Sequence, residues 1–127
     1  MRYLTLEQVH RIHQAVLKAH GGSDGIRDPG LLDAALAMPE ATFGGELLHP
    51  DIASAAGAYL YHLCQNHPFI DGNKRVGALS AVVFLKANGW QLTWTNNELE
   101  RYVLQVAAGE MRKDPLTALL RNSIERI

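Results

Sequence analysis

Helix start and stop signals recur along the sequence and restrict it to a series of short helices. Thr5-Leu6-Glu7-Gln8 is typical of a capping box, in which the first and fourth residues satisfy each other's free backbone N–H groups. Gly21-Gly22 is typical of a helix end, and Asp28-Pro29 of the next helix start. Because apolar residues recur at helical spacing between these signals, we expect helices over about 5–21 and 28–39.

Similar signals predict four more helices, over about 50–66, 73–88, 95–108 and from 114 onward. Pro68 ends the third because it disfavours helical geometry in the residue before it, and Thr95 or Asn97 caps the fifth. Apolar residues nearly encircle the fourth, which is expected to be the central helix. We expect a loop over 41–49 and one short strand over 91–95. The predicted fold class is an all-α bundle of about six helices with at most a short strand or hairpin.

Length and composition exclude several kinds of protein. A chain of 127 residues is expected to form one domain over 1–127. Its formal net charge of -1 provides no global field for binding nucleic acid, and its single cysteine, Cys64, excludes an intramolecular disulfide. No apolar run approaches the roughly 18 residues that cross a membrane. We therefore expect a cytoplasmic protein that binds neither nucleic acid directly nor a membrane.

The chemically richest stretch is His67-Pro68-Phe69-Ile70-Asp71-Gly72-Asn73-Lys74-Arg75, between the third and fourth helices. A helix start attracts anions, and Gly72 permits a close approach of a ligand to the backbone. Lys74 and Arg75 oppose the helix dipole unless a bound anion, such as a polyphosphate, offsets their charge. Asp71 offers a hard oxygen ligand for Mg²⁺, and His67 supplies an imidazole, the side chain whose unperturbed pKa suits proton transfer near neutral pH. These groups together predict a phosphate-transfer site.

This stretch resembles the signature of the Fic/Doc superfamily, H-x-F-x-[D/E]-G-N-[G/K]-R, at every fixed position. Lys74 in place of the commoner glycine is similar to the death-on-curing (Doc) toxin branch. The resemblance extends to Gly25-Ile26-Arg27-Asp28-Pro29-Gly30 before the motif and to Phe84, Leu85 and Asn88-Gly89 after it. It covers nearly the whole chain and implies a Fic/Doc-type helical bundle.

The resemblance also implies a role for each motif residue. It implies that His67 is the general base, that Phe69 anchors the loop in the core and that Asp71 binds Mg²⁺. Gly72 and Asn73 are implied to form the anion-binding turn, with the Asn73 side chain contacting phosphate. Lys74 is implied to belong to the nucleotide site, and Arg75 to contact phosphate and stabilise developing charge. ATP is the implied co-substrate. In the Doc branch the lysine implies a reversed nucleotide and transfer of the γ-phosphate, which makes the protein a kinase.

The implied target is a threonine or serine of a translation factor like EF-Tu, and the implied partner is a Phd-like antitoxin protein. Three alternatives remain from the sequence. The first is a Fic-type transferase that moves AMP, and the second is a non-catalytic module that binds nucleotide or antitoxin. The third, a metal-dependent nuclease, lacks the second carboxylate that two-metal sites usually have.

A few other polar residues invite a functional interpretation. Arg27 either contacts nucleotide or target, or is solvated. His10 and His13 share a helix face, but without a third ligand they are expected to be solvated or capping residues. His62 and His67 are badly spaced for a zinc site with Cys64, which is expected to be a small buried residue.

Overall fold

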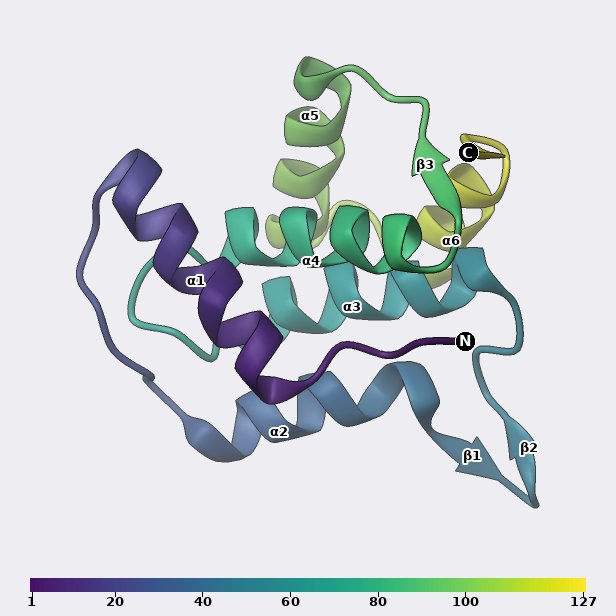
Figure 1. Ribbon diagram of the computed structural model, residues 1–127, viewed down its shortest axis with the longest axis horizontal. Helices are drawn as coiled ribbons and strands as arrows, with labels where there is room; N and C mark the ends of the chain where they lie inside the picture. The colour runs from purple at the N-terminus through teal and green to yellow at the C-terminus, as the bar shows by residue number, and fades with distance from the viewer.

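Six helices make up most of the fold, in a computed structural model that describes residues 1–127. They are α1 (Leu6–His20), α2 (Pro29–Ala37), α3 (Ile52–Asn66), α4 (Asn73–Ala87), α5 (Asn96–Ala107) and α6 (Lys113–Arg121) (Figure 1). The predicted fold class, a bundle of about six helices, is confirmed. None of the helices is both long and apolar enough to cross a membrane.

Three predicted helix starts are confirmed by their hydrogen bonds. The Thr5 hydroxyl accepts from the Gln8 N–H, and the Gln8 side chain accepts from the Thr5 N–H, which completes the capping box. Asp28 caps α2 with its side chain, directly before the proline at the first helical position. Of the two candidates for α5, Thr95 is the cap, and it forms a second capping box with Glu98.

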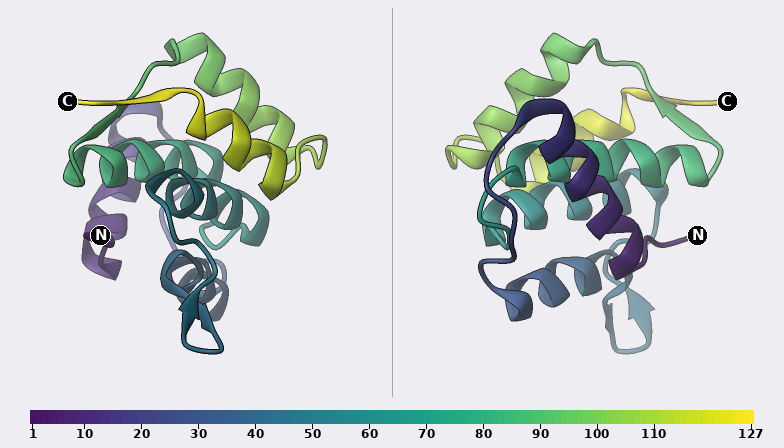
Figure 2. Two further views of the ribbon diagram at one scale, coloured as in Figure 1. Left: turned by 90° about the vertical axis from the view of Figure 1, so that its right-hand side faces the viewer. Right: turned by 60° about the vertical axis from the view of Figure 1, so that its left-hand side comes forward.

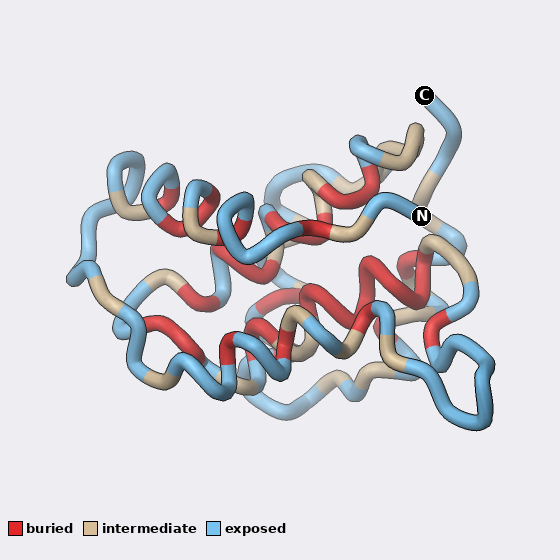
Figure 3. The backbone as a smooth tube through the Cα atoms, turned by 60° about the horizontal axis from the view of Figure 1, so that its bottom comes forward, coloured by how far each residue is buried: buried red, intermediate tan, exposed pale blue.

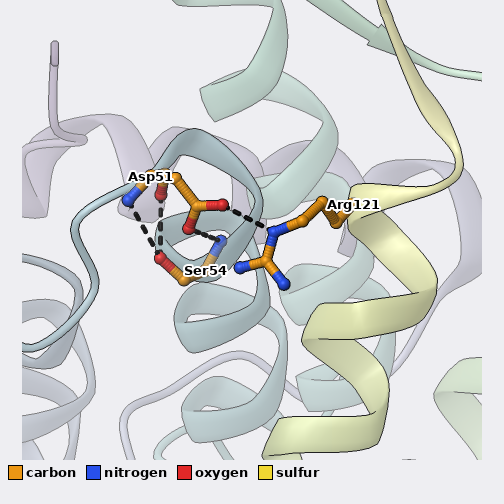
Figure 4. A network of polar contacts seen from close by, with 3 residues as sticks. All are labelled: Asp51, Ser54 and Arg121. Atoms are coloured by element: carbon orange, nitrogen blue, oxygen red, sulfur yellow. Dashed lines mark hydrogen bonds and ion pairs between the residues drawn. The ribbon is translucent and has the colours of Figure 1, made fainter.

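The start of α3 is tied to the end of α6. Its cap is Asp51, whose carboxylate accepts from the Ser54 N–H at 3.1 Å and from Arg121 Nε at 2.8 Å (Figure 4). The hydrogen bond from Arg121 is the main reason that the pKa of Asp51 falls to about 2. The sixth helix was expected to begin with Asp114 as its cap, which is wrong by two residues: Arg112 is the N-cap and Asp114 lies in the first turn.

The segment expected to be a loop over 41–49 contains a hairpin. A 3₁₀ helix, Met38–Glu40, leads into β1 (Thr42–Phe43), which pairs antiparallel with β2 (Glu46–Leu47). Gly44 and Gly45, with φ of 61° and 82°, form the turn, and such positive angles match the twist of a tight hairpin. Every residue of both strands is exposed, as the tube at the lower right of Figure 3 shows.

A second small sheet joins the predicted strand to the C-terminal segment. β3 (Trp90–Leu92) pairs antiparallel with β4 (Ile124–Arg126), so that Trp90 lies opposite Arg126. The Arg126 guanidinium lies 4.8 Å from the centre of the Trp90 ring, a favourable cation–π distance. The strand was expected over 91–95, whereas pairing with β4 sets its bounds one residue earlier at the start and three earlier at the end.

The most buried helix is α3, which corrects the expectation that α4 is central. Ten residues of α3 are buried, compared with seven residues of α4. In addition, α3 contacts α2, α4, α5 and α6. Buried residues concentrate along these two helices (Figure 3). Small residues allow this packing, because a Cβ on Gly77 of α4 would lie 3.0 Å from Cys64 Sγ and 3.1 Å from the Leu60 carbonyl.

Gly77→Ala tests this close approach of α3 and α4. The added methyl group meets the Leu60 backbone, which cannot move aside like a flexible side chain, so we expect a loss of about 1–3 kcal/mol of unfolding free energy. Urea denaturation measures this change.

The matched control is Gly30→Ala in α2, where the nearest atom to a new Cβ is 3.4 Å away and the glycine is exposed. It should leave the protein as stable or more stable by about 0.5–1 kcal/mol, because alanine favours helix over glycine. Equal stability of the two variants would show that α3 and α4 tolerate a wider spacing.

Candidate functional site

The motif loop, residues 67–72, joins α3 to α4 and lies beside the segment that joins α1 to α2. Both segments run along the left edge of Figure 1 and stay together in the right panel of Figure 2. Ile26 and Phe69 form an antiparallel β-bridge between them. The motif loop is therefore held from outside by a second stretch of backbone.

His67 ends α3 in a left-handed conformation, with φ of 51° and ψ of 52°. It is the only residue other than glycine with a positive φ, and its side chain is exposed. Arg27 Nε donates to the His67 carbonyl at 2.6 Å, and Nη2 donates to the Asn66 carbonyl at 2.9 Å. These bonds satisfy the free end of α3 and place a cation there, which stabilises a helix C-terminus. The sequence left open whether Arg27 contacts nucleotide or target or is solvated, and the structure shows an exposed side chain whose guanidinium holds the end of α3.

The Asn73 side chain lies inside the loop and is 5% exposed. Its Oδ1 accepts from the Phe69 N–H at 2.8 Å, and its Nδ2 donates to the Phe69 carbonyl at 2.9 Å. The same Nδ2 lies 2.9 Å from Nδ1 of His67. The carboxamide is thus occupied within the loop, whereas the expected role was a contact of this side chain with phosphate.

His13 supports the loop from beneath, which corrects the expectation of a solvated or capping residue. Only 1% of it is exposed, and its ring stacks on the buried Phe69 with centroids 3.9 Å apart. Nε2 of His13 lies 2.9 Å from the Asp71 carbonyl oxygen, to which it donates. Val9, Ile12 and Val16 bury the same face of α1, so the sequence carried a signal for burial but none for this contact.

Asp71 presents an exposed carboxylate beside the 21–28 segment. One oxygen, Oδ2, accepts from the Ser23 N–H at 2.7 Å, and the other makes no hydrogen bond. Gly22 lets the two segments come this close, since a Cβ there would lie 3.2 Å from Cβ of Asp71. A single carboxylate fits Mg²⁺, which usually takes one or two from the protein and completes its shell with water and substrate phosphates.

The start of α4 has features that attract an anion. Gly72 is left-handed, with φ of 87°, and gives no side-chain cap, so the N–H groups of Asn73, Lys74 and Arg75 have no partner. Lys74 and Arg75 are exposed and form no ion pair. Unpaired N–H groups, the positive end of the helix dipole and two free cations together attract a multiply charged anion.

Other polar clusters lie outside this loop. No group of three His, Cys, Asp or Glu side chains is placed to hold a metal ion, at Cys64 or elsewhere. Cys64 is buried, and burial raises its thiol pKa to about 12. Burial, together with Lys113, lowers the pKa of His62 to about 4, and Lys113 Nζ lies 3.2 Å from its Nε2.

Comparison with known proteins identifies sequences similar to this chain. The profile of the Fic/DOC family matches residues 3–85. The chain is 39% identical over 104 residues to "Toxin Doc" of Mycolicibacterium smegmatis, covering 80% of each protein. It is 31% identical over 121 residues to "Protein kinase doc" of Escherichia phage P1, covering 95% of this chain and 94% of that protein.

His13→Phe tests the support beneath the loop. The variant keeps an aromatic ring against Phe69 but leaves the Asp71 carbonyl without its donor. We expect a loss of about 1–3 kcal/mol of unfolding free energy, together with faster amide exchange in residues 69–72.

His10→Phe is the control, because the His10 ring also contacts Phe69, at 6.4 Å between centroids, but makes no hydrogen bond. Its stability and amide exchange should stay close to those of the wild type. Equal losses of unfolding free energy in the two variants would show that the hydrogen bond of His13 does not contribute to stability.

Proposed function

The chain belongs to the Fic/DOC family, and from this membership and the geometry of its 67–75 loop we propose that it is a Doc-type protein kinase toxin. It transfers the γ-phosphate of ATP to a threonine or serine hydroxyl of a translation factor like EF-Tu, which arrests translation. The start of α4, with its unpaired N–H groups and two free cations, is the observation that carries the proposal.

The nucleotide binds through its phosphates at the start of α4. A triphosphate carries several negative charges and many acceptor oxygens, and this helix start offers three unpaired donors with Lys74 and Arg75 beside them. Gly72 lets this helix start pack tightly against α1, since a Cβ there would lie 3.3 Å from Val16. Asn73 contributes its backbone N–H, since its side chain is held inside the loop.

Asp71 is the residue that holds Mg²⁺ against the phosphates in this proposal. Its free carboxylate oxygen is available, and the bond from Ser23 to the other oxygen orients the group. When bound, Mg²⁺ neutralises charge on the transferred phosphate. Arg75 supplies a second, permanently charged group for the same purpose, because a guanidinium stays protonated at any physiological pH.

His67 takes the proton of the target hydroxyl. Its exposed imidazole begins the loop that ends at the phosphate-binding turn, so base and nucleotide share one short segment. The O–H bond of the target breaks and a new N–H bond forms on the ring. The oxygen forms a bond to the γ-phosphorus while the bond from that phosphorus to the leaving ADP breaks. Such a reaction needs mainly positioning and charge neutralisation, which this loop offers.

AMP transfer is the second candidate, because other Fic proteins share the motif with glycine at position 74. Lys74 favours the kinase, since the resemblance to the Doc branch rests on it, and the relative from phage P1 is named a protein kinase. A non-catalytic binding module is disfavoured by the presence of His67 and Asp71, both of which a nucleotide-binding relic could lose.

The biological setting follows from the relatives. One of them is named a toxin, so we propose that this chain, as one domain over 1–127, acts in the cytoplasm and is restrained by a Phd-like antitoxin. The modest net charge of -1 agrees with a protein target rather than nucleic acid.

His67→Ala tests the kinase proposal with ATP labelled at either the γ- or the α-phosphate and a bacterial lysate as the source of target. We expect wild-type protein to transfer γ-label only, and the variant to transfer it about 10²–10⁴-fold more slowly, the range for a lost acid–base group. Its nucleotide affinity, measured by calorimetry, should stay nearly unchanged.

His20→Ala is the control, since this exposed histidine at the end of α1 makes no side-chain hydrogen bond. Transfer of α-label by wild-type protein would support the AMP transferase, and loss of RNA without label would support a nuclease. Absence of any label, without loss of RNA, would support the non-catalytic binding module. Wild-type rates in His67→Ala would remove His67 from the base role.

Lys74→Gly tests the choice between phosphate and AMP. We expect weaker transfer of γ-label and the appearance of α-label, because the smaller residue leaves open the space that the lysine fills in the Doc branch. Mass spectrometry of the modified target distinguishes an added phosphate from an added AMP.

Lys86→Gly, at an exposed position in the last turn of the same helix, controls for the loss of helix propensity. It should retain γ-transfer. Unchanged γ-transfer in Lys74→Gly would mean that the lysine does not determine which phosphate reacts.

A further inference from the structure

The orientation of the Asn73 carboxamide is fixed by its hydrogen bonds to Phe69. A backbone N–H can only donate, so the atom that faces the Phe69 N–H at 2.8 Å must be the carboxamide oxygen. A backbone carbonyl can only accept, so the atom 2.9 Å from the Phe69 oxygen must be the NH₂ nitrogen. Because Asn73 is almost completely buried, water cannot substitute for either partner.

This orientation determines the protonation of His67. The NH₂ group of Asn73 is only a donor, and it lies 2.9 Å from Nδ1 of His67. Nδ1 must therefore present its lone pair. A neutral imidazole carries one proton, which then resides on Nε2. Both the Nδ1–H tautomer and the doubly protonated ring would place one N–H against another.

This tautomer does not suit a base at the position where the structure holds the ring. The only lone pair of the ring is on Nδ1, and Asn73 occupies it. Nε2 carries a proton, so it can donate a hydrogen bond to an approaching hydroxyl but cannot take its proton. In this arrangement His67 is a hydrogen-bond donor toward the target.

We propose that Asn73 is a positioning residue that holds His67 in a resting, Nε2–H form, and that the imidazole must leave Asn73 before it accepts a proton. The inference rests on the proposed role of His67 as base. The ring is the part that moves, because His67 is exposed whereas Asn73 is buried and bonded twice to Phe69. An exposed ring can exchange this bond for one to water.

Once free of Asn73, Nδ1 takes the proton: the O–H bond of the target breaks, an N–H bond forms at Nδ1, and the ring becomes an imidazolium with both nitrogens protonated. The oxygen keeps the electron pair and bonds to the γ-phosphorus as ADP leaves. The hydrogen bond to Asn73 re-forms only after Nδ1 has released its proton to water. Only the neutral ring, which can act as a base again, therefore makes the resting contact.

The test is ¹⁵N NMR of nucleotide-free protein labelled in its histidines, because nitrogen shifts and two-bond couplings identify the protonated ring nitrogen. We expect the neutral His67 ring to be entirely Nε2–H with an accepting Nδ1. His20, exposed and without a hydrogen bond, is the internal reference and should exchange between both tautomers. A His67 ring that is Nδ1–H, or that averages like His20, would overturn the proposal.

Two variants extend the test. In Asn73→Asp an acceptor replaces the NH₂ group, so the ring should change to the Nδ1–H tautomer. In Asn73→Ala the donor is removed, and the ring should average like His20. An unchanged His67 spectrum in either folded variant contradicts the proposal, and the wild-type spectrum decides if neither folds. The spectra need no phosphate transfer, so a kinase proposal that fails the labelling experiment leaves this result intact, and the reverse holds as well.

Discussion

The contact between α3 and α4 is the constraint on which the site depends. Gly77 brings α4 against the Cys64 side chain and the Leu60 carbonyl, so the two helices lie side by side with little between them. Residues 67–72 must then reverse the chain over a short distance. His67 and Gly72 do so with left-handed backbone angles, at the end of one helix and the start of the next. The same reversal puts an imidazole and an uncapped helix start into one loop.

A reversal this tight needs support, and most of it comes from residues far away in the sequence. His13 lies beneath the loop, and Arg27 and the Ser23 backbone hold it from the side. Loops that carry chemistry are usually more mobile than the elements they connect, and here the backbone carbonyls of His67 and Asp71 are both paired. The exposed side chains of the loop are therefore presented from a fixed backbone.

Local interactions explain what could be predicted from sequence. The caps at Thr5, Asp28 and Thr95 involve partners three residues away, so their residue types alone identify them. The motif likewise located the loop and its unpaired helix start. Contacts between distant segments could not be predicted: the stacking of His13 on Phe69 is one of them. We expected α4 to be central because apolar residues nearly encircle it, but the four alanines and one glycine of α3 let that helix pack closely against four neighbouring helices.

The bond from the Ser23 N–H to Asp71 limits how that carboxylate can coordinate a cation. With one lone pair of Oδ2 already engaged, Oδ1 is the oxygen without a hydrogen bond, which favours a monodentate contact with the Mg²⁺ of the proposed function. Ca²⁺ favours large shells of six to eight oxygens and often binds both oxygens of a carboxylate. Mg²⁺ instead binds in a compact octahedral shell, to which a carboxylate can contribute a single oxygen. In the proposed kinase, a backbone amide two helices upstream of the motif would thus favour the smaller ion without touching it.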